Sequence, residues 1–446
     1  MPTGGNTLKR KPLQHPSLPC SCITAAGPLH GQKQGDAASR DGYRISIGLL
    51  AYALASLVPF LACAERTVSR ERSAPSLSAT PPEAQVQVRT PVRYHVSSMG
   101  NDRNPGTARA PFRSIQHAAD AARAGDTVIV GPGLYIGGDR IVSLEHSGSS
   151  AAWITFRAEP KWTAVLDGRG GISHEGWYFG PNVGFVRVEG FEIRDMQEHG
   201  FDTYGGGVHD VSIVRNHVHH IGRNCTDTSN GRTGASLGAG TRRVILDGNV
   251  WHDIGRLGPG EGGCSPRTKY YQNHDHGIYV ADADEVTIQN NVFYSFRRGW
   301  PIHRYYSKGS PVRGLTVVNN TFVGPNPYRS GQIILAGPTG ELRIENNIFY
   351  APQSAALLFE DRRVEGARVR YNMVYPGELK EGRARGVSFE HNWERTDPRF
   401  TGPDNFRLKL ESPALDAGLP LAWVTHDAEG VRRPRGRGYD LGAYER

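Results

Sequence analysis

A short motif recurs through the central part of the chain and limits the folds that it can adopt. Each copy has apolar residues at its first and third positions and asparagine at its sixth. The clear copies are VSIVRN (211–216), VILDGN (244–249), VTIQNN (286–291), LTVVNN (315–320) and LRIENN (342–347). The alternation predicts strands with one buried face. The asparagine indicates a corner, because Asn tolerates left-handed backbone and bonds its neighbours.

The spacing of the motif distinguishes between repeat architectures. Successive asparagines are 33, 42, 29 and 27 residues apart. One strand–turn–strand unit of this size cannot bury its own apolar face, whereas stacked units do so and bring equivalent residues to about 4.8 Å from one another. A β-propeller would need four strands per repeat and a more regular period of about 40 to 45 residues. The sequence therefore predicts an all-β fold, a right-handed parallel β-helix with ladders of asparagine side chains.

The segment before the repeats indicates how the solenoid begins. Residues 94–135 read as a strand, a turn, a short helix and another strand, with the helix capped near Ser114 and ended by Gly125. The apolar face of this helix is expected to cover the open end of the solenoid. We therefore expect one β-helix domain over residues 92–446, with a polar, proline-containing linker over 64–91.

An apolar segment near the N-terminus predicts export. Residues 45–62 form an uncharged run that follows Arg44, and Cys63 comes directly after it. The length of the run lies between that of a signal-peptide core and a membrane span, and Ala62 with Cys63 resembles a bacterial lipoprotein cleavage site. We expect residues 1–44 to be unstructured and the protein to be extracellular or held at the cell envelope. Lipidation of Cys63, cleavage of a signal peptide and a retained anchor are the alternatives for residues 45–63.

The distribution of charge argues against nucleic acid as a partner. The chain has 52 Lys and Arg against 44 Asp and Glu, a net charge of +8. Residues 1–91 hold ten basic and five acidic side chains, which leaves +3 for residues 92–446. A domain so nearly balanced has no strong basic footprint. We expect a monomer whose partner is a polysaccharide.

Two cysteines lie in the predicted domain, each within a long insertion. Cys225 and Cys264 belong to the insertions at about 222–234 and 255–273, which leave neighbouring coils. In an exported protein such a pair predicts a disulfide. A metal site would need more ligands at closer spacing.

The strands before each motif place candidate site residues in columns. EHGFDTY (198–204), RTGASLG (232–238), DHGIYV (275–280) and GWPIHRYY (299–306) are expected to stack. The residues expected to face inward are Phe201, Ala235, Ile278 and Ile302. Because side chains alternate along a strand, the next residue of each strand faces outward, which gives one outer column of Asp202, Ser236, Tyr279 and His303. The column beside it holds His199, Thr233, His276 and Trp300.

The two ends of the predicted domain resemble a known superfamily. GNDRNPGT, PFRSIQHA and GDTVIVGPGLY near the start, with SPALDAG (412–418) and residues 427–445 at the end, are similar to bacterial right-handed β-helix proteins of the pectate-lyase-like superfamily. The resemblance covers about 92–446 and implies the fold. The superfamily includes polysaccharide lyases, glycoside hydrolases and alginate epimerases. GASLGAG (234–240) lacks the basic lysine of one pectate lyase family, and Asp275-His276 lacks the proline of the epimerase motif.

The outer columns suggest a lyase that acts on a uronic-acid polymer by β-elimination. Such an enzyme needs a base for the proton α to the carboxylate, an acid for the leaving oxygen and a group that holds the carboxylate. The predicted catalytic residues are His276, Tyr279, His303 and Arg304. The predicted substrate-binding residues are His199, Asp202, Trp300, Tyr305 and Lys308.

Other uses of the same residues remain open. A glycoside hydrolase would use Asp202 with a second carboxylate, Asp195 or Asp210, and a non-catalytic envelope protein would only bind glycan. Metal sites are considered at His274 and His276 with His199, and for Ca²⁺ at Asp282, Asp284 and Glu285. The residues after two asparagine corners are expected to anchor the long loops: His217, His219, His220, His252 and Asp253.

Overall fold

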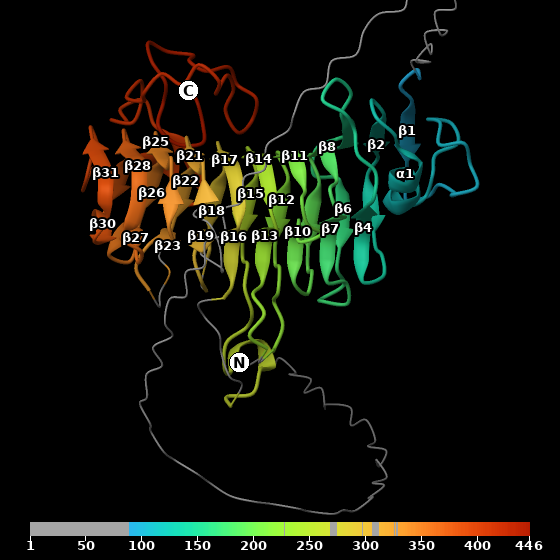
Figure 1. The fold of residues 1–446 in the computed structure, drawn as a ribbon, viewed down its shortest axis with the longest axis horizontal. Helices are drawn as coiled ribbons and strands as arrows, with labels where there is room; N and C mark the ends of the chain where they lie inside the picture. The colour runs from blue at the N-terminus through green and yellow to red at the C-terminus, as the bar shows by residue number, and fades with distance from the viewer. Residues whose placement is uncertain are drawn as a thin grey trace, which may run out of the picture. The chain divides into compact units, whose positions relative to one another are not determined.

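The computed structural model describes residues 89–446, apart from residues 227, 268–273, 297, 306–311, 325 and 327–328. Within this described part the chain winds into a stack of coils that advances from β1 to β31 (Figure 1). Each complete coil contributes one strand to each of three parallel sheets, called sheets 1, 2 and 3 in the order in which the chain visits them. The predicted all-β parallel β-helix is confirmed.

Sheet 1 contains the recurrent motif and pairs its strands in register from coil to coil. Its main strands are β1 (Arg93–Val96), β2 (Thr127–Val130), β5 (Ile154–Ala158), β8 (Gly184–Glu189), β11 (His209–Val214), β14 (Thr241–Asp247), β17 (Ala283–Gln289), β21 (Thr316–Val318), β25 (Arg343–Glu345), β28 (Arg363–Arg370) and β31 (Arg385–Glu390). Two short strands, β20 (Val312–Arg313) and β24 (Thr339–Gly340), extend it.

Sheets 2 and 3 complete each coil. Sheet 2 follows the corner and contains β3 (Gly133–Tyr135), β6 (Ala164–Asp167), β9 (Glu192–Arg194), β12 (His217–His219), β15 (Val250–His252), β18 (Val292–Tyr294), β22 (Thr321–Val323), β26 (Ile348–Tyr350) and β29 (Met373–Tyr375). Sheet 3 contains β4 (Arg140–Leu144), β7 (Glu175–Phe179), β10 (His199–Asp202), β13 (Thr233–Leu237), β16 (His276–Ala281), β19 (Ile302–Tyr305), β23 (Ile333–Ala336), β27 (Ala355–Phe359) and β30 (Glu378–Gly382).

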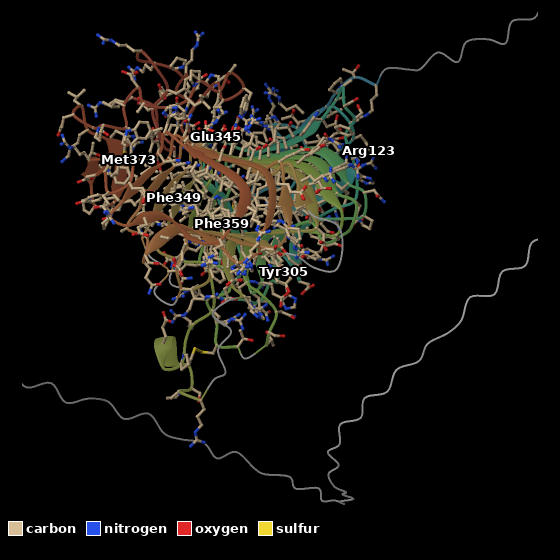
Figure 2. The ribbon with its side chains drawn as sticks, turned by 60° about the vertical axis from the view of Figure 1, so that its left-hand side comes forward. Arg123, Tyr305, Glu345, Phe349, Phe359 and Met373 are labelled. Carbon is tan, nitrogen blue, oxygen red and sulfur yellow. A yellow bond between two sulfur atoms is a disulfide. The ribbon has the colours of Figure 1, made fainter. Side chains whose placement is uncertain are left out.

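Inward side chains from all three sheets fill the solenoid. The rings of Phe293, Phe322 and Phe349 stack on one another at centroid distances of 4.8 and 4.9 Å. Figure 2 shows Phe349 and Phe359 between the sheets and Tyr305 on the outer side. Complete burial of such a side chain contributes roughly 1.5–3 kcal/mol. The repeated hydrophobic pattern therefore stabilises the stack one coil at a time.

The motif asparagines form a continuous ladder at the corner between sheets 1 and 2. The Oδ1 atom of each accepts hydrogen bonds from the backbone N–H and the Nδ2 group of the asparagine one coil earlier. The ladder runs through Asn216, Asn249, Asn291, Asn320, Asn347, Asn372 and Asn392. The ladder expected from the repeat is present.

The left-handed backbone at this corner belongs to the residue before the ladder asparagine. Arg215, Asn290, Asn319 and Asn346 all have positive φ, between 52° and 58°. The expectation that the sixth motif position supplies the left-handed conformation is therefore corrected. The fifth position turns the chain, and the sixth saturates buried backbone groups with hydrogen bonds.

Replacing Asn320 by Ala is expected to lower the free energy of unfolding by roughly 2–5 kcal/mol. Asn320 is fully buried, and its removal leaves the Asn291 backbone N–H and the Ile288 carbonyl without their side-chain partner. Each such group costs about 1–3 kcal/mol. Asn392→Ala, at the partly exposed end of the ladder, is the control and should cost less because water can replace the amide. Equal losses for the two variants in urea denaturation would contradict this account.

A short helix and a C-terminal segment cover parts of the stack. Helix α1 (Ile115–Ala121) is capped by Ser114, whose Oγ accepts from the His117 N–H at 3.1 Å, and its buried face joins the main core. The predicted cap is confirmed, although the helix ends before Gly125. After β32 (Phe400–Gly402) and β33 (Asn405–Leu408), the remaining chain packs on the outer face of sheet 2.

The two long insertions are tied together as predicted. Cys225 and Cys264 form a disulfide with a Cα–Cα distance of 5.4 Å, and the second insertion includes a 3-10 turn, η1 (Glu261–Gly263). Asp275 and Arg256 form a fully buried ion pair at 2.8 Å between the insertions and sheet 3. None of the described helices is long and apolar enough to span a membrane. Residues 1–88, with Cys63, lie outside the described part.

Candidate active site

A cleft of about 690 Å³ opens on the outer face of sheet 3. Its floor is formed by side chains from β7 to β23, and the long insertions contribute Ser229, Asn230, Gly231 and His274 to its lining. A concavity of this size is typical of a small-molecule or saccharide subsite. The insertions that the disulfide joins therefore wall one side of the cleft.

Both columns expected from the sequence form in register. Asp202 pairs with Ser236, Ser236 with Tyr279 and Tyr279 with His303 along one column. The neighbouring column pairs His199 with Thr233 and Thr233 with His276. All of these residues, and Trp300, line the cleft. Parallel strands pair residue for residue, so once the inward residues of neighbouring coils are aligned correctly, the outward residues are aligned too. Their roles toward a substrate stay a prediction.

Two buried imidazoles meet at the floor of the cleft. The Nε2 atom of His276 lies 2.8 Å from Nδ1 of His303, so the two rings share one proton. The backbone N–H of Trp300 donates to Nδ1 of His276 at 3.4 Å. Burial, with the positive charge of Arg304, lowers the pKa of His303 to about 3. Both rings are thus neutral near pH 7, and His303 is a weak base.

Tyr279 lines the cleft and packs against this histidine pair. Its ring stacks on His276 at 5.5 Å and on Tyr305 at 6.1 Å, and it meets His303 edge to face at 5.4 Å. Burial raises the pKa of the Tyr279 hydroxyl above its usual value. The phenol therefore stays protonated and can donate a proton or a hydrogen bond.

Four carboxyl groups line the cleft, and three of them are paired with arginine. The pairs are Glu175 with Arg140, Glu198 with Arg232, and Glu360 with Arg329. For Asp202, the described residues supply no ion pair. It accepts a hydrogen bond from the Tyr204 N–H at 3.0 Å. Burial raises the pKa of Asp202 to about 6, so this carboxyl is neutral in mildly acidic solution and the cleft carries little net charge.

Arg304 does not reach the cleft. It pairs with Val280 and Leu335 on the inward face of the strands, is 0% exposed and donates to the Pro338 carbonyl at 2.6 Å. The expectation that it holds a substrate carboxylate is corrected, because the period of two that turns His303 outward turns Arg304 inward. Lys308 lies outside the described residues.

The second carboxylates considered for hydrolysis also lie elsewhere. Asp210 is on sheet 1 and pairs with Arg243 at 2.6 Å, and Asp195 follows β9 of sheet 2. Sequence reasoning missed Glu175, which pairs in register with His199 one coil earlier. The inward–outward alternation of HEGWYF (174–179) could have placed Glu175 on the outer face, but this coil lacks a clear copy of the asparagine motif by which to align it. Arg329 was also missed, because it lies in a loop where no repeat fixes its position; its guanidinium lies 5.0 Å from the Trp300 ring.

The metal sites considered from sequence are not supported at this cleft. The carboxylate of Asp275 is used by Arg256, and His276 is engaged with His303. Asp284 and Glu285 lie on β17 of sheet 1, away from the residues that line the cleft. A requirement for Ca²⁺ stays a prediction.

Comparison with known proteins agrees with the fold. The model of a Pel9A-like, right-handed β-helix region matches residues 94–299, which include most of the cleft floor. The model of a right-handed β-helix region matches residues 267–400. YwoF, an uncharacterized protein of Bacillus subtilis (strain 168), is 23% identical, and the match covers 65% of this chain and 81% of YwoF.

Solved structures give the same result. The pectate lyase Pel9A superposes with a TM-score of 0.51 at 16% identity, over 80% of this chain and 97% of that one. An alginate lyase from Paenibacillus sp. str. FPU-7 gives a TM-score of 0.42 at 15% identity, over 63% of this chain and 96% of that one. The match to Pel9A, at 16% identity, establishes the fold alone.

Proposed function

We propose that the cleft of this right-handed parallel β-helix, in which residues 94–299 match the model of a Pel9A-like right-handed β-helix region, binds and cleaves a polysaccharide. One observation carries the proposal: acid–base groups and aromatic rings meet in a single groove. Tyr279, Trp300 and Tyr305 offer rings on which sugars can pack, next to His303 and Asp202. One solved structure that shares this fold, over 80% of this chain, is the pectate lyase Pel9A.

The reaction that we assign is β-elimination on a uronic-acid polymer. His303 takes the C5 proton at Nε2 in the tautomer that has the shared proton on Nδ1 of His303. In this tautomer neutral His276 carries its own proton at Nδ1, and the long 3.4 Å hydrogen bond from the Trp300 N–H is given up. The electron pair of the C5–H bond forms the C4–C5 double bond, the C4–O bond breaks, and the Tyr279 hydroxyl protonates the leaving oxygen. His276 acts as a positioning residue through its bond to His303.

The substrate carboxylate needs a positive partner in place of Arg304. Arg329 lines the cleft beside Trp300 and forms an ion pair with Glu360. Its planar guanidinium suits a carboxylate. Of the other carboxyl groups of the cleft, Glu175 and Glu198 form ion pairs with arginine, and Asp202 is neutral in mild acid. Their electrostatic repulsion of a uronate carboxylate is therefore weak.

Hydrolysis is the second candidate, and a specific observation favours it. Asp202 has a pKa of about 6, which suits a general acid, whereas the pKa of His303, about 3, makes a weak base. Glu175, in the neighbouring coil, would then be the second carboxyl group.

The test is a substrate panel with two readouts. The purified protein is incubated with pectin, alginate, glycosaminoglycans and neutral glycans, with Ca²⁺ or with EDTA. Ultraviolet absorbance from the new C4–C5 double bond indicates elimination, and reducing ends without that absorbance indicate hydrolysis. Glycan binding without either product would refute cleavage and leave a binding protein.

We also propose that the protein works outside the cytoplasm. The disulfide between Cys225 and Cys264 suits an oxidising compartment, and the apolar run at 45–62 precedes Cys63. Fractionation of cells, with lipid labelling of the wild type and of Cys63→Ala, tests export and lipidation. Cytosolic protein that retains residues 1–62 would refute the proposal.

A further inference from the structure

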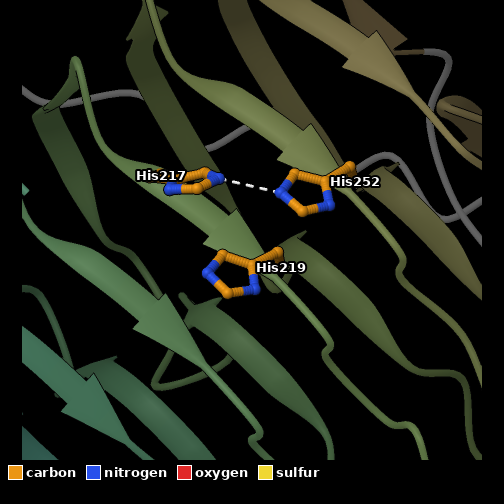
Figure 3. A group of neighbouring side chains, drawn as sticks. All are labelled: His217, His219 and His252. Atoms are coloured by element: carbon orange, nitrogen blue, oxygen red, sulfur yellow. Dashed lines mark hydrogen bonds between the residues drawn. The ribbon is translucent and has the colours of Figure 1, made fainter. Parts of the chain in front are cut away.

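A group of three histidines lies on the outer face of sheet 2, away from the cleft on sheet 3. His217 and His219 come from β12, on either side of the inward Val218, and His252 comes from β15. Parallel pairing sets His219 directly beside His252. Figure 3 shows the three rings together, with His217 and His252 facing each other.

The ring nitrogens of this group converge. Nε2 of His217 lies 2.8 Å from Nε2 of His252, and one nitrogen from each of the three rings lies within 4.8 Å of the others. The rings of His219 and His252 are parallel, with centroids 4.8 Å apart. Among the described residues, Nε2 of His219 has no hydrogen-bond partner although it is buried, and the nearest carboxylate oxygen, of Glu192, is 3.4 Å away. A buried nitrogen without a partner costs about 1–3 kcal/mol.

Neighbouring groups orient these rings as metal-binding histidines are oriented. Nδ1 of His252 donates to the Asp253 carboxylate at 2.7 Å, which leaves the lone pair of its Nε2 directed at the group. Nδ1 of His219 lies 2.7 Å from Nδ1 of His220, so its Nε2 is likewise the nitrogen that faces the others.

We propose that His217, His219 and His252 bind one divalent transition-metal ion, of which Zn²⁺ is the best fit. Imidazole nitrogens favour zinc-type ions over Ca²⁺ or Mg²⁺. With bonds of about 2.0–2.1 Å, tetrahedral ligands lie about 3.3 Å apart. The Nε2 atoms of His217 and His252 are 2.8 Å apart, and the three ligand nitrogens all lie within 4.8 Å of one another, a range that includes that value. Small rotations of the rings are enough to bind the ion.

The position of the site indicates what the metal does. The two long insertions leave directly after β12 and β15, the disulfide joins them, and they contribute residues to the lining of the cleft. A metal that joins the two strands fixes the bases of both insertions, as the disulfide fixes their outer parts. The ion is therefore structural, and its effect on the cleft is indirect.

The test measures metal content and stability in protein without a histidine tag. After exposure to Zn²⁺ and dialysis, the wild type should retain one zinc per chain by mass spectrometry, and its unfolding temperature should fall when EDTA removes it. His219→Ala and His252→Ala should bind zinc more weakly by at least roughly 10–100-fold, the loss typical even for the partners of metal ligands. His426→Ala, an exposed histidine outside the group, should behave as the wild type.

A second measurement does not depend on folding of the variants. X-ray absorption of the zinc-loaded wild type should show scattering from imidazole ligands. A wild type that retains no zinc, a His219→Ala variant that retains a full equivalent, or a spectrum without imidazole would each refute the site.

Discussion

Replacement of Tyr279 by Phe is expected to lower the turnover of the polysaccharide by roughly 10²–10⁴-fold, the usual contribution of a positioned acid. The change removes only the hydroxyl oxygen, which is the proton donor to the leaving oxygen in the proposed elimination. The ring keeps its contacts with His276 and Tyr305, so the fold and the affinity for the sugar chain should change little. Turnover at saturating substrate, with binding measured separately by calorimetry, gives the two quantities.

Tyr178 offers a matched control for this experiment. It occupies the same outer column three coils earlier, where it pairs in register with Asp202, and its ring lies against Arg140 rather than in the cleft lining. Tyr178→Phe should therefore retain nearly full turnover. If Tyr279→Phe also retains it, or if both variants lose the same amount, then Tyr279 is not the acid.

The fold could be predicted because the same local pattern is repeated in space as well as in sequence. Inward residues such as Phe201 and Ile278 are aligned by the ladder asparagines, and parallel pairing carries that alignment to every other position of the coil. The candidate cleft columns followed from the same alignment. Tertiary contacts were not needed to place them.

The remaining parts of the site depend on structure that does not repeat. Arg329 and the insertion residues of the cleft wall are positioned by loops, whose path is fixed by contacts such as the buried Arg256–Asp275 pair. No periodic signal in the sequence encodes such contacts. The inward direction of Arg304 was available from the period of two, and missing it was an error of interpretation.

The histidines after the asparagine corners show the same limit. The sequence places them at the bases of the insertions, but the separation between His217 and His252 depends on how adjacent coils pair. The three rings converge because β12 and β15 pair as adjacent parallel strands, which the sequence does not specify. The prediction that they anchor the loops stays open, and metal binding would give it a physical basis.

Replacement of Asp202 by Asn is expected to separate the two candidate reactions. Burial raises the pKa of Asp202 to about 6, so its carboxyl is neutral below that pH and ionised above it. In an elimination on a uronate polymer, ionisation adds a negative charge beside an anionic substrate, and kcat/KM should fall as the pH rises through about 6. The amide of Asp202→Asn stays neutral, so the variant should remain active and lose that fall.

Hydrolysis predicts the opposite result for the same variant. There the Asp202 carboxyl gives its proton to the leaving oxygen, so the wild type also loses activity above about pH 6, but an amide cannot replace the acid. Asp202→Asn should then lose roughly 10²–10⁴-fold at every pH. Asp210→Asn, which alters a carboxylate on sheet 1 outside the cleft, is the control and should follow the wild type. Initial rates from about pH 4 to about pH 8 decide between the reactions, and an Asp202→Asn profile identical to the wild type would exclude a role for Asp202 in either.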